Sequence, residues 1–365
     1  MTPEIERVPT VPGWVEAVII GIVSRLIALA ALWVAWAYRI PTPIGLHWTS
    51  PVIIWDAQWY LWIVNNGYHA GAVGHTGFGT GYYDFAFFPL YPSLIAIFSL
   101  GGQLPVDIVA PVLSNVLFVL ALVPIRIGLE RLFDRKIARF GLLLFAFSPA
   151  AYAYSLAYSE PLFLLIAGGF LLTTEPVKGF VLGALAGFTR LSFGGLAAAS
   201  LGDLIDPKTR RRGLAGLAGI LLAFGAWWGW IANLTHNFWG YMLGTPSWYS
   251  NDGPTGSLTG IASILHAPNP IVLFTLALGA VIAIGTLALF RRREYRPALF
   301  SAACFAMAFL ATWNTMPRLM AVAFPAFAAF AALLPSDRWR WLAVAISVPS
   351  MCVVGALAVA GYVVP

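Results

Sequence analysis

The sequence predicts an all-α protein that crosses a membrane many times. The chain is 60% hydrophobic and only 10% charged, and its mean hydropathy is +0.81. An ordinary soluble domain carries about 25% charged residues. Apolar runs of roughly 15–25 residues recur along the chain, as expected of helices that satisfy their own backbone hydrogen bonds in lipid. The runs are continuously apolar and do not alternate, which excludes a transmembrane β-barrel.

The expected architecture is a single domain, 1–365, with about 11 or 12 membrane segments. The first span, 15–38, is expected to stay uncleaved, because its apolar run is too long for a signal peptide and acidic residues precede it. A piece at 86–100, broken by Pro89 and Pro92, is expected to turn back within the membrane. The later spans are expected at 107–130, 138–158, 160–174, 177–189, 191–205, 213–234, 270–290, 297–312, 316–334 and 340–362.

Four clusters of basic residues predict the topology, because cytoplasmic loops are enriched in Lys and Arg. If 86–100 turns back and the N-terminus is cytoplasmic, all four clusters face the cytoplasm. A full crossing by 86–100 would instead force the first cluster outside. The first arrangement therefore places the long segment 39–85 and the turn at 158–160 on the outer side. The clusters are Arg131/Arg135/Lys136/Arg139, Lys208/Arg210/Arg211/Arg212, Arg291/Arg292/Arg293/Arg296 and Arg338/Arg340.

The net charge of +6 does not indicate a nucleic-acid partner, since these basic loops are typical of topology signals and of contacts with lipid headgroups. Cys304 and Cys352 lie inside apolar runs and are interpreted as small buried hydrophobes. All five histidines fall in the two long outer loops, 39–85 and 235–269, without the i, i+4 spacing of a helical metal site. No metal site and no cofactor are expected. The glycine-rich stretch 71–81 is either a linker or a lid.

Asp56 follows the first span and stands among aromatic residues. An acid at a membrane boundary is costly to desolvate and is a functional candidate for that reason. Three interpretations remain open for Asp56. It could cap a short helix over 57–65, it could pair with a buried arginine, or it could act as a general base in a partly dry cleft.

Three further charged residues are candidates for the same site. Glu160 precedes Pro161 at the start of an apolar run, where it could simply cap a helix. Arg190 separates two apolar pieces that are each too short for a full span, so these pieces are expected to pair at half depth with Arg190 in an outward-facing cavity. Arg190 cannot lose its charge, and it therefore needs a carboxylate or an anionic ligand. Arg318 supports the same argument more weakly.

Aromatic residues crowd the first outer segment. Most of them are typical of an interfacial belt, while others could stack on a sugar or line a groove for a lipid tail. They are Trp55, Trp59, Tyr60, Trp62, Tyr68, Tyr82 and Tyr83.

Several blocks between residues 55 and 325 resemble the PIG-V family, which comprises GPI mannosyltransferase 2-type enzymes and their bacterial and archaeal relatives. The first block is specific, and the last alone would be weak. The blocks are Trp55-Asp56-x-x-Trp59-Tyr60-x-x-Ile63-x-x-x-Gly67-Tyr68, Phe85-Ala86-Phe87-Phe88-Pro89-Leu90-Tyr91-Pro92, Ser148-Pro149-Ala150, Ala157-Tyr158-Ser159-Glu160, Gly187-Phe188-Thr189-Arg190-Leu191-Ser192, Met316-Pro317-Arg318 and Phe324-Pro325.

The resemblance implies a GT-C glycosyltransferase fold. It also implies a polyprenyl- or dolichyl-phosphate sugar donor, usually of mannose, used on the non-cytoplasmic side. The family's catalytic acid corresponds to Asp56, and its second outward-facing acid corresponds to Glu160. The chain departs from the family at Val64 and at Asn65–Asn66, and it lacks the large later loops of eukaryotic members. These departures leave the acceptor undetermined, as either a lipid-linked or a glycan hydroxyl. The Arg-rich, Lys-poor composition favours a prokaryotic cell membrane.

The expected chemistry is a single, inverting displacement that needs no metal. Asp56 would be the general base, and Arg190 and Arg318 would contact the donor phosphate. Glu160 would orient the acceptor or hold one of the arginines. The other expected substrate-binding residues are Trp55, Gln58, Trp59, Tyr60 and Tyr158. A transporter or lipid flippase is the rival hypothesis, because it also uses intramembrane charges and interrupted helices. A non-catalytic subunit of a glycosylation complex is a third.

Overall fold

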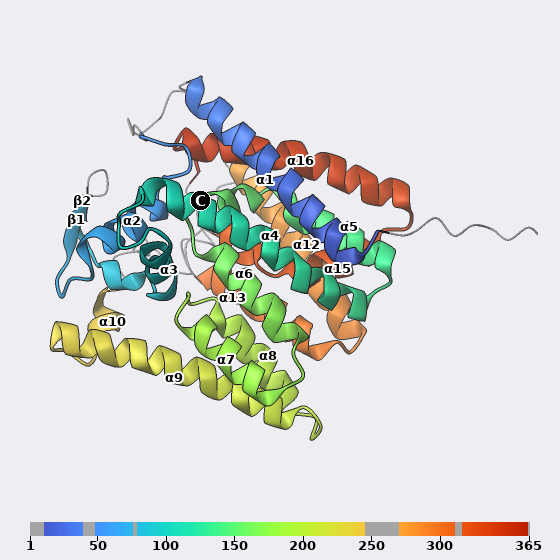
Figure 1. The fold of residues 1–365 in the computed structure, drawn as a ribbon. Helices are drawn as coiled ribbons and strands as arrows, with labels where there is room; N and C mark the ends of the chain where they lie inside the picture. Colours follow the sequence, from blue (N-terminus) through green and yellow to red (C-terminus); the bar gives the residue numbers. More distant parts are fainter. Residues whose placement is uncertain (1–10, 39–47, 76–78, 245–269, 311–315, 364–365) are drawn as a thin grey trace, which may run out of the picture.

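A computed structural model describes residues 11–38, 48–75, 79–244, 270–310 and 316–363. Within these ranges the chain is helical apart from one small hairpin (Figure 1). Five described helices are long and apolar enough to cross a bilayer, so the chain is a multi-pass integral membrane protein. These helices are α1 (Gly13–Ala37), α4 (Val106–Leu132), α9 (Arg210–Thr235), α12 (Pro270–Arg291) and α16 (Asp337–Val359).

Shorter helices fill the space between the long ones. Each has 10 to 16 residues, fewer than the roughly 20 that a perpendicular span needs. They are α5 (Arg135–Ala146), α6 (Glu160–Leu172), α7 (Pro176–Gly187), α8 (Phe193–Asp203), α13 (Tyr295–Leu310) and α15 (Phe324–Leu333).

Two of the expected spans are not continuous helices. The segment expected at 138–158 consists of α5 followed by the short 3-10 helix η2 (Ala151–Ser155). Pro149 explains the break, because proline disfavours the helical conformation of the residue before it. The segment expected at 316–334 is divided into α14 (Met316–Ala321) and α15, and Pro325 stands in the first turn of the second helix. The second break follows α14, which carries Arg318 and Leu319 of the candidate site.

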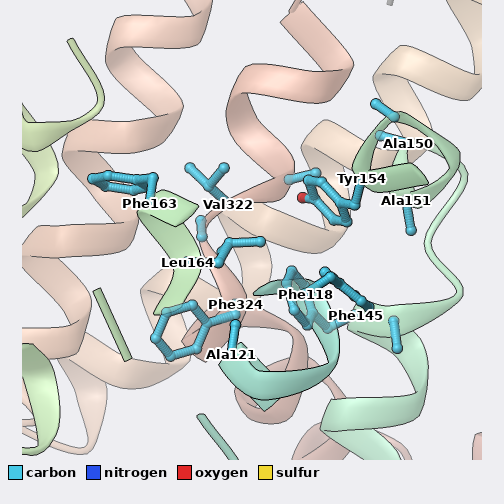
Figure 2. Close-up of a cluster of buried hydrophobic side chains, with 14 of the residues drawn as sticks. Phe118, Ala121, Phe145, Ala150, Ala151, Tyr154, Phe163, Leu164, Val322 and Phe324 are labelled. Atoms are coloured by element: carbon cyan, nitrogen blue, oxygen red, sulfur yellow. The ribbon is translucent and has the colours of Figure 1, made fainter. Parts of the chain in front are cut away.

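The helices form an extensive apolar core. One cluster joins α4, α5 and η2 around three aromatic rings, and it continues to Val322 and Phe324 (Figure 2). The Phe118 and Tyr154 rings are stacked, with centroids 5.1 Å apart, and the Phe145 ring lies about equally far from both, at 6.0 and 5.9 Å. Such packing fixes the position of η2 against the long helix α4.

Glycines allow α7 and α9 to lie unusually close. A Cβ atom at Gly219 would overlap the Phe180 carbonyl oxygen of α7, and a Cβ atom at Gly187 would lie 2.8 Å from the Ile220 carbonyl oxygen of α9. Small residues at such crossings are typical of helix pairs in membranes, where backbone-to-backbone packing supplies the attraction. The contact holds the short helix α7, and the connection that follows it, against a full-length span.

The basic clusters gather at one end of the helices. Lys136 pairs with Asp337, Arg139 pairs with Glu16, and Arg292 donates to the Leu132 carbonyl at 3.1 Å. These contacts join the N-terminal end of α1 to connections that are far apart in sequence. In Figure 1 this end lies on the right, where α1, α5 and α16 begin.

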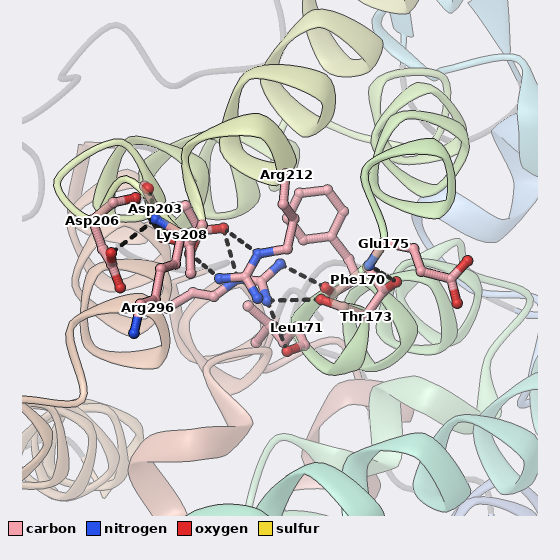
Figure 3. A network of polar contacts seen from close by, with 10 residues as sticks. Phe170, Leu171, Thr173, Glu175, Asp203, Asp206, Lys208, Arg212 and Arg296 are labelled. Atoms are coloured by element: carbon pink, nitrogen blue, oxygen red, sulfur yellow. Dashed lines mark hydrogen bonds and ion pairs between the residues drawn. The ribbon is translucent and has the colours of Figure 1, made fainter.

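A network at the same end secures four helix termini (Figure 3). Arg296, at the start of α13, donates to the Phe170, Leu171 and Thr173 carbonyls at 2.8–3.2 Å, at the C-terminal end of α6. Asp203, in the last turn of α8, accepts from Arg212 of α9 and lies 3.2 Å from the Arg296 guanidinium. The arginine donors satisfy carbonyls that no intrahelical bond can reach.

The opposite end contains the interfacial elements of the first loop. They are α2 (Asp56–Asn66), a hairpin of β1 (Val73–His75) and β2 (Gly79–Tyr82), the 3-10 helix η1 (Asp84–Ala86) and α3 (Leu90–Phe98). The nine residues of α3 occupy most of the segment that was expected to turn back. The strands lie in the glycine-rich stretch that was expected as a linker or lid. Of the second predicted outer loop, residues 245–269 lie outside the described ranges, as do His47 and His266.

Candidate active site

Asp56 is the first residue of α2. The preceding Trp55 has φ of 51°, a left-handed conformation that bulky residues rarely adopt. Such strained backbone tends to persist at functional sites, where the surrounding structure enforces it. The helix begins at Asp56 itself, with Trp55 in the capping position, so Asp56 does not precede the helix as the capping hypothesis required. Its Oδ2 instead accepts a hydrogen bond from Arg318 Nη1 at 2.7 Å.

Arg318, on the short helix α14, joins the two acids. Its Nη1 contacts Asp56, and its Nε lies 3.1 Å from Glu160 Oε1. The same Glu160 oxygen lies 2.6 Å from Arg190 Nη1. The four charged residues that were expected to converge therefore form one continuous ion-pair cluster. Arg318, for which the sequence argument was weaker, is its centre.

The cluster is built where helices are interrupted. Glu160 begins α6 after the η2 turn, Arg190 lies in the connection between α7 and α8, and Arg318 lies on α14 before the break at Pro325. Interrupted helices place side chains at membrane depth with access to a cavity, which an unbroken helix in a packed bundle does not offer. Arg190 is further held by its Nε, which donates to Ser192 Oγ at 3.0 Å.

These side chains line a cavity of about 210 Å³. One part of its wall is polar, formed by the four charged residues with Tyr60, Ser159, Thr189 and Ser192. Another part is apolar, formed by Ala86, Phe87, Phe88, Leu191, Cys304, Met307, Ala308 and Leu319. The cavity can hold a small amphiphilic group with an anionic or hydroxylated side and an apolar side.

Tyr158 packs against the ion-pair cluster through its contact with Arg318. The Arg318 guanidinium carbon lies 4.8 Å from the centre of the Tyr158 ring, within the range of a cation–π contact. The Tyr158 hydroxyl donates to the Ile54 carbonyl at 3.2 Å, two residues before Asp56. Its backbone N–H donates to Ser114 Oγ on α4. Tyr158 thus connects the segment that carries Asp56 to the segment that carries Glu160.

Tyr60 presents a hydroxyl to the cavity. It donates to Ser159 Oγ at 2.7 Å, one residue before Glu160. Burial raises the pKa of Tyr60, and the negative charge of Glu160 acts in the same direction. The hydroxyl therefore stays protonated and can donate or accept a hydrogen bond near a substrate.

The loop that forms the Phe87–Phe88 wall is fixed by polar contacts of its own. The buried Asp84 accepts from the His69 backbone N–H at 3.1 Å, and one of its oxygens lies 2.7 Å from His69 Nδ1. The Tyr68 hydroxyl donates to the Phe87 carbonyl at 2.9 Å. These bonds join the end of α2 to the cavity wall.

The remaining predicted site residues lie outside the described cavity lining. Trp59 is fully buried and stacks on Phe87, with centroids 6.1 Å apart. Trp55 packs beside Trp48 at 5.5 Å, and Gln58 is half-buried in the first turn of α2. Ser159, Thr189, Ser192 and Met307 line the cavity and were not predicted. Ser159 and Thr189 are immediate neighbours of predicted charged residues, and Ser192 lies two residues after Arg190, which is the signal that could have identified them.

Residues 45–197 match the family model described as Mannosyltransferase (PIG-V). This range contains Asp56, Glu160 and Arg190 and ends before Arg318. No curated protein matches the chain.

The fold is similar to that of solved structures of the oligosaccharyltransferase AglB from Archaeoglobus fulgidus. With the complex of that enzyme with an inhibitory peptide and a dolichol-phosphate, the TM-score is 0.52 at 13% sequence identity. The match covers 95% of this chain and 56% of that one. The apo form of the same enzyme gives the same TM-score, identity and coverage. The chain thus spans about half the length of the structures it matches, and at this identity the likeness shows the fold alone.

Proposed function

We propose that this chain is a membrane glycosyltransferase of the GT-C type and that it transfers a sugar from a polyprenyl- or dolichyl-phosphate donor. The PIG-V match over residues 45–197 and the likeness in fold to an archaeal oligosaccharyltransferase support this proposal. The sugar is mannose, and the acceptor is a hydroxyl of a lipid-linked or glycan molecule. The observation that carries the proposal is the meeting of two acids and two arginines in one cavity.

Asp56 is the general base in this proposal. It is the more accessible of the two acids, with 25% of its side chain exposed against 2% for Glu160. The acceptor oxygen forms a bond to the anomeric carbon of the sugar while its proton passes to the Asp56 carboxylate. The bond from that carbon to the phosphate oxygen breaks, and the electron pair leaves with the lipid phosphate. One displacement by one base inverts the anomeric configuration.

The arginines stabilise the leaving phosphate. Glu160 holds Arg190 and Arg318 side by side through one carboxylate oxygen, which leaves other guanidinium N–H groups available for a ligand. Donors that are already oriented stabilise charge as it develops on a leaving group. Glu160 is therefore a positioning residue in this proposal.

The charge balance of the cluster favours a phosphodiester donor. Two arginines and two carboxylates sum to no net charge. A donor with a single negative charge can bind to such a cluster with modest rearrangement, whereas a diphosphate would bring at least one more uncompensated charge into a low-dielectric site. The matched archaeal enzyme is described in complex with a dolichol-phosphate, and this likeness also supports a lipid phosphate as donor.

The site faces the outside of the cell in this proposal. All the basic clusters gather at the end of the helices opposite α2 and α3, and basic ends are typically cytoplasmic. The membrane is proposed to be a prokaryotic cell membrane.

Asp56→Asn tests the proposal directly. The purified protein in detergent is incubated with polyprenyl-phosphate mannose and a lipid-linked or glycan acceptor, and the mass of the acceptor is followed. We expect Asp56→Asn to stay folded and to lose roughly 10²–10⁴-fold in turnover, as loss of a general base does. Asp107→Asn is the matched control, because Asp107 is an exposed acid in the first turn of α4.

Two outcomes would contradict the proposal. Near-wild-type turnover by Asp56→Asn would remove Asp56 from the role of base. A wild-type protein that adds no sugar to any acceptor, but moves the lipid across reconstituted vesicles, would support the flippase hypothesis.

A further inference from the structure

Arg25 is a buried arginine of α1 that the proposed reaction does not use. It is 3% exposed, and among the described residues no carboxylate pairs with it. Its Nη1 donates to the Ala151 carbonyl at 2.7 Å and to Ser155 Oγ at 3.0 Å. Its Nη2 donates to Ser24 Oγ at 2.7 Å and to the Ala146 carbonyl at 3.3 Å. The guanidinium also lies 4.1 Å from the centre of the Phe118 ring.

The Ala146 carbonyl is open for a physical reason. Ala146 is the last residue of α5, and the chain cannot continue as a helix through Ser148 and Pro149. The final carbonyls of a helix have no intrahelical donor, and water does not supply one in an apolar core. Ser24 supplies one donor to Ala146 at 2.6 Å. Arg25 Nη2 supplies a second donor to Ala146, and the positive charge of Arg25 suits the negative end of the α5 dipole.

The segment that Arg25 holds leads directly to the cavity. Ala151 and Ser155 are the ends of η2, and only four residues lie between Ser155 and Glu160. The residues between them include Tyr158, beneath Arg318, and Ser159, the partner of Tyr60. The helix η2 also packs against α4, α14 and α16. Gly355 of α16 lacks the side chain that would crowd Tyr152, whose Cβ would be 3.1 Å away.

We propose that Arg25 is a positioning residue of the transferase site, which fixes η2 so that Tyr158, Ser159 and Glu160 reach the arginine cluster. The inference rests on the proposed function only where it is tested by the rate of sugar transfer. Arg25 touches neither substrate nor reacting atoms. It acts through the backbone of the segment whose polar side chains hold Arg190 and Arg318.

Lysine cannot replace Arg25 in this role. A guanidinium presents five N–H donors in a fixed planar fork, and here the two terminal nitrogens bind groups on both sides of the break after α5. An ammonium is a single point that cannot reach Ala146 and Ala151 together in the same geometry. Arg25→Lys thus keeps the charge but releases one end of η2.

The kinetic experiment compares Arg25→Lys with Arg296→Lys. Arg296 is the matched control because it also caps helix carbonyls, those of Phe170, Leu171 and Thr173, but at the far end of α6. With polyprenyl-phosphate mannose as donor, we expect Arg25→Lys to lower kcat on the order of 10- to 100-fold, as small misplacements of catalytic groups do. KM for the donor should change less, and Arg296→Lys should keep the wild-type kcat.

A double-mutant cycle separates positioning from a general loss of stability. If Arg25 acts by placing Glu160, then Glu160→Gln lowers kcat by a much smaller factor in the Arg25→Lys background than in the wild type. Equal factors in the two backgrounds would overturn the proposal.

Alkylation of Cys304 gives a measurement that needs no transferase activity. Cys304 lines the cavity, and Cys352 is the chain's other cysteine. With Cys352→Ser as the parent, iodoacetamide should modify Cys304 several times faster after Arg25→Lys, because Arg190 loses its fixed partner. Arg296→Lys should leave the rate unchanged. If wild-type protein transfers no mannose, the proposed function fails, while this rate still tests Arg25. Parent-like alkylation in Arg25→Lys would overturn the positioning role.

Discussion

The two acids of the cavity differ in a way that decides their roles. Glu160 is buried and contacts both arginines, whereas Asp56 is partly exposed and contacts one. Removing one partner from a buried ion pair leaves uncompensated charge, which costs far more than removing an accessible group. This difference supports the proposed roles, in which Glu160 stabilises the cluster and Asp56 takes the acceptor proton.

Glu160→Gln should accordingly destabilise the protein by about 3 kcal/mol or more and also lower donor affinity. Asp56→Asn should lower the melting temperature less. Thermal unfolding in detergent, followed by tryptophan fluorescence, measures both. Glu175→Gln is the control, because Glu175 is exposed and its one ion pair within the described part of the chain is with the exposed Lys178. A melting temperature for Glu160→Gln equal to that of the control would show that the cluster does not depend on this charge.

The sequence identified the charged residues of the site because such residues are rare in apolar segments and each requires a partner. It did not specify which acid pairs with which arginine, since those contacts join positions as much as 262 residues apart. Neutral lining residues such as Met307 were not predicted, because nothing distinguishes a cavity-lining methionine from a core one in sequence. The unusual backbone at Trp55 is likewise a product of tertiary packing.

At the scale of elements, the short helices were predicted better than the broken ones. Two short helices flank Arg190 as expected, α7 and α8, since neither apolar piece was long enough to span, and their depth in the membrane stays a prediction. The division of 138–158 was missed because its hydropathy is continuous, even though Ser148-Pro149 was visible. Hydropathy measures the preference for lipid, while the local backbone restriction by proline ends the helix.

The crossing of α7 and α9 offers a test at this scale. Gly219→Ala should destabilise the protein by about 1–3 kcal/mol, because the added methyl group collides with the α7 backbone. Gly225→Ala, on the same helix, meets open space and should be neutral or slightly stabilising, as alanine is the better helix former. The melting temperatures of the two variants report the difference. Equal effects would show that the close approach is not required for stability.

The whole molecule has two chemically different ends. One contains the arginine-rich connections, and the other contains α2, the hairpin, α3 and the mouth of the candidate site. The PIG-V match over residues 45–197 and the fold agree with the membrane glycosyltransferase that the sequence predicted, while the reaction and the sidedness of these ends stay predictions.

Cysteine labelling tests the sidedness in whole cells. In a background without Cys304 and Cys352, Asn65→Cys should react with a membrane-impermeant maleimide in intact cells. Lys208→Cys should react only after permeabilisation. Both positions are exposed and lie in described segments. Labelling of both from one side, or the reverse pattern, would contradict the proposed orientation.

The thirteen-residue helix α6 connects these ends, since the Glu160 cluster holds its first residue and Arg296 holds its last carbonyls. The length of α6 consequently determines where Glu160 lies relative to the Arg296 end of the helix. One residue added between the two anchors would turn Glu160 by about 100° around the helix axis and shift it by about 1.5 Å, which would carry its carboxylate away from Arg190 and Arg318.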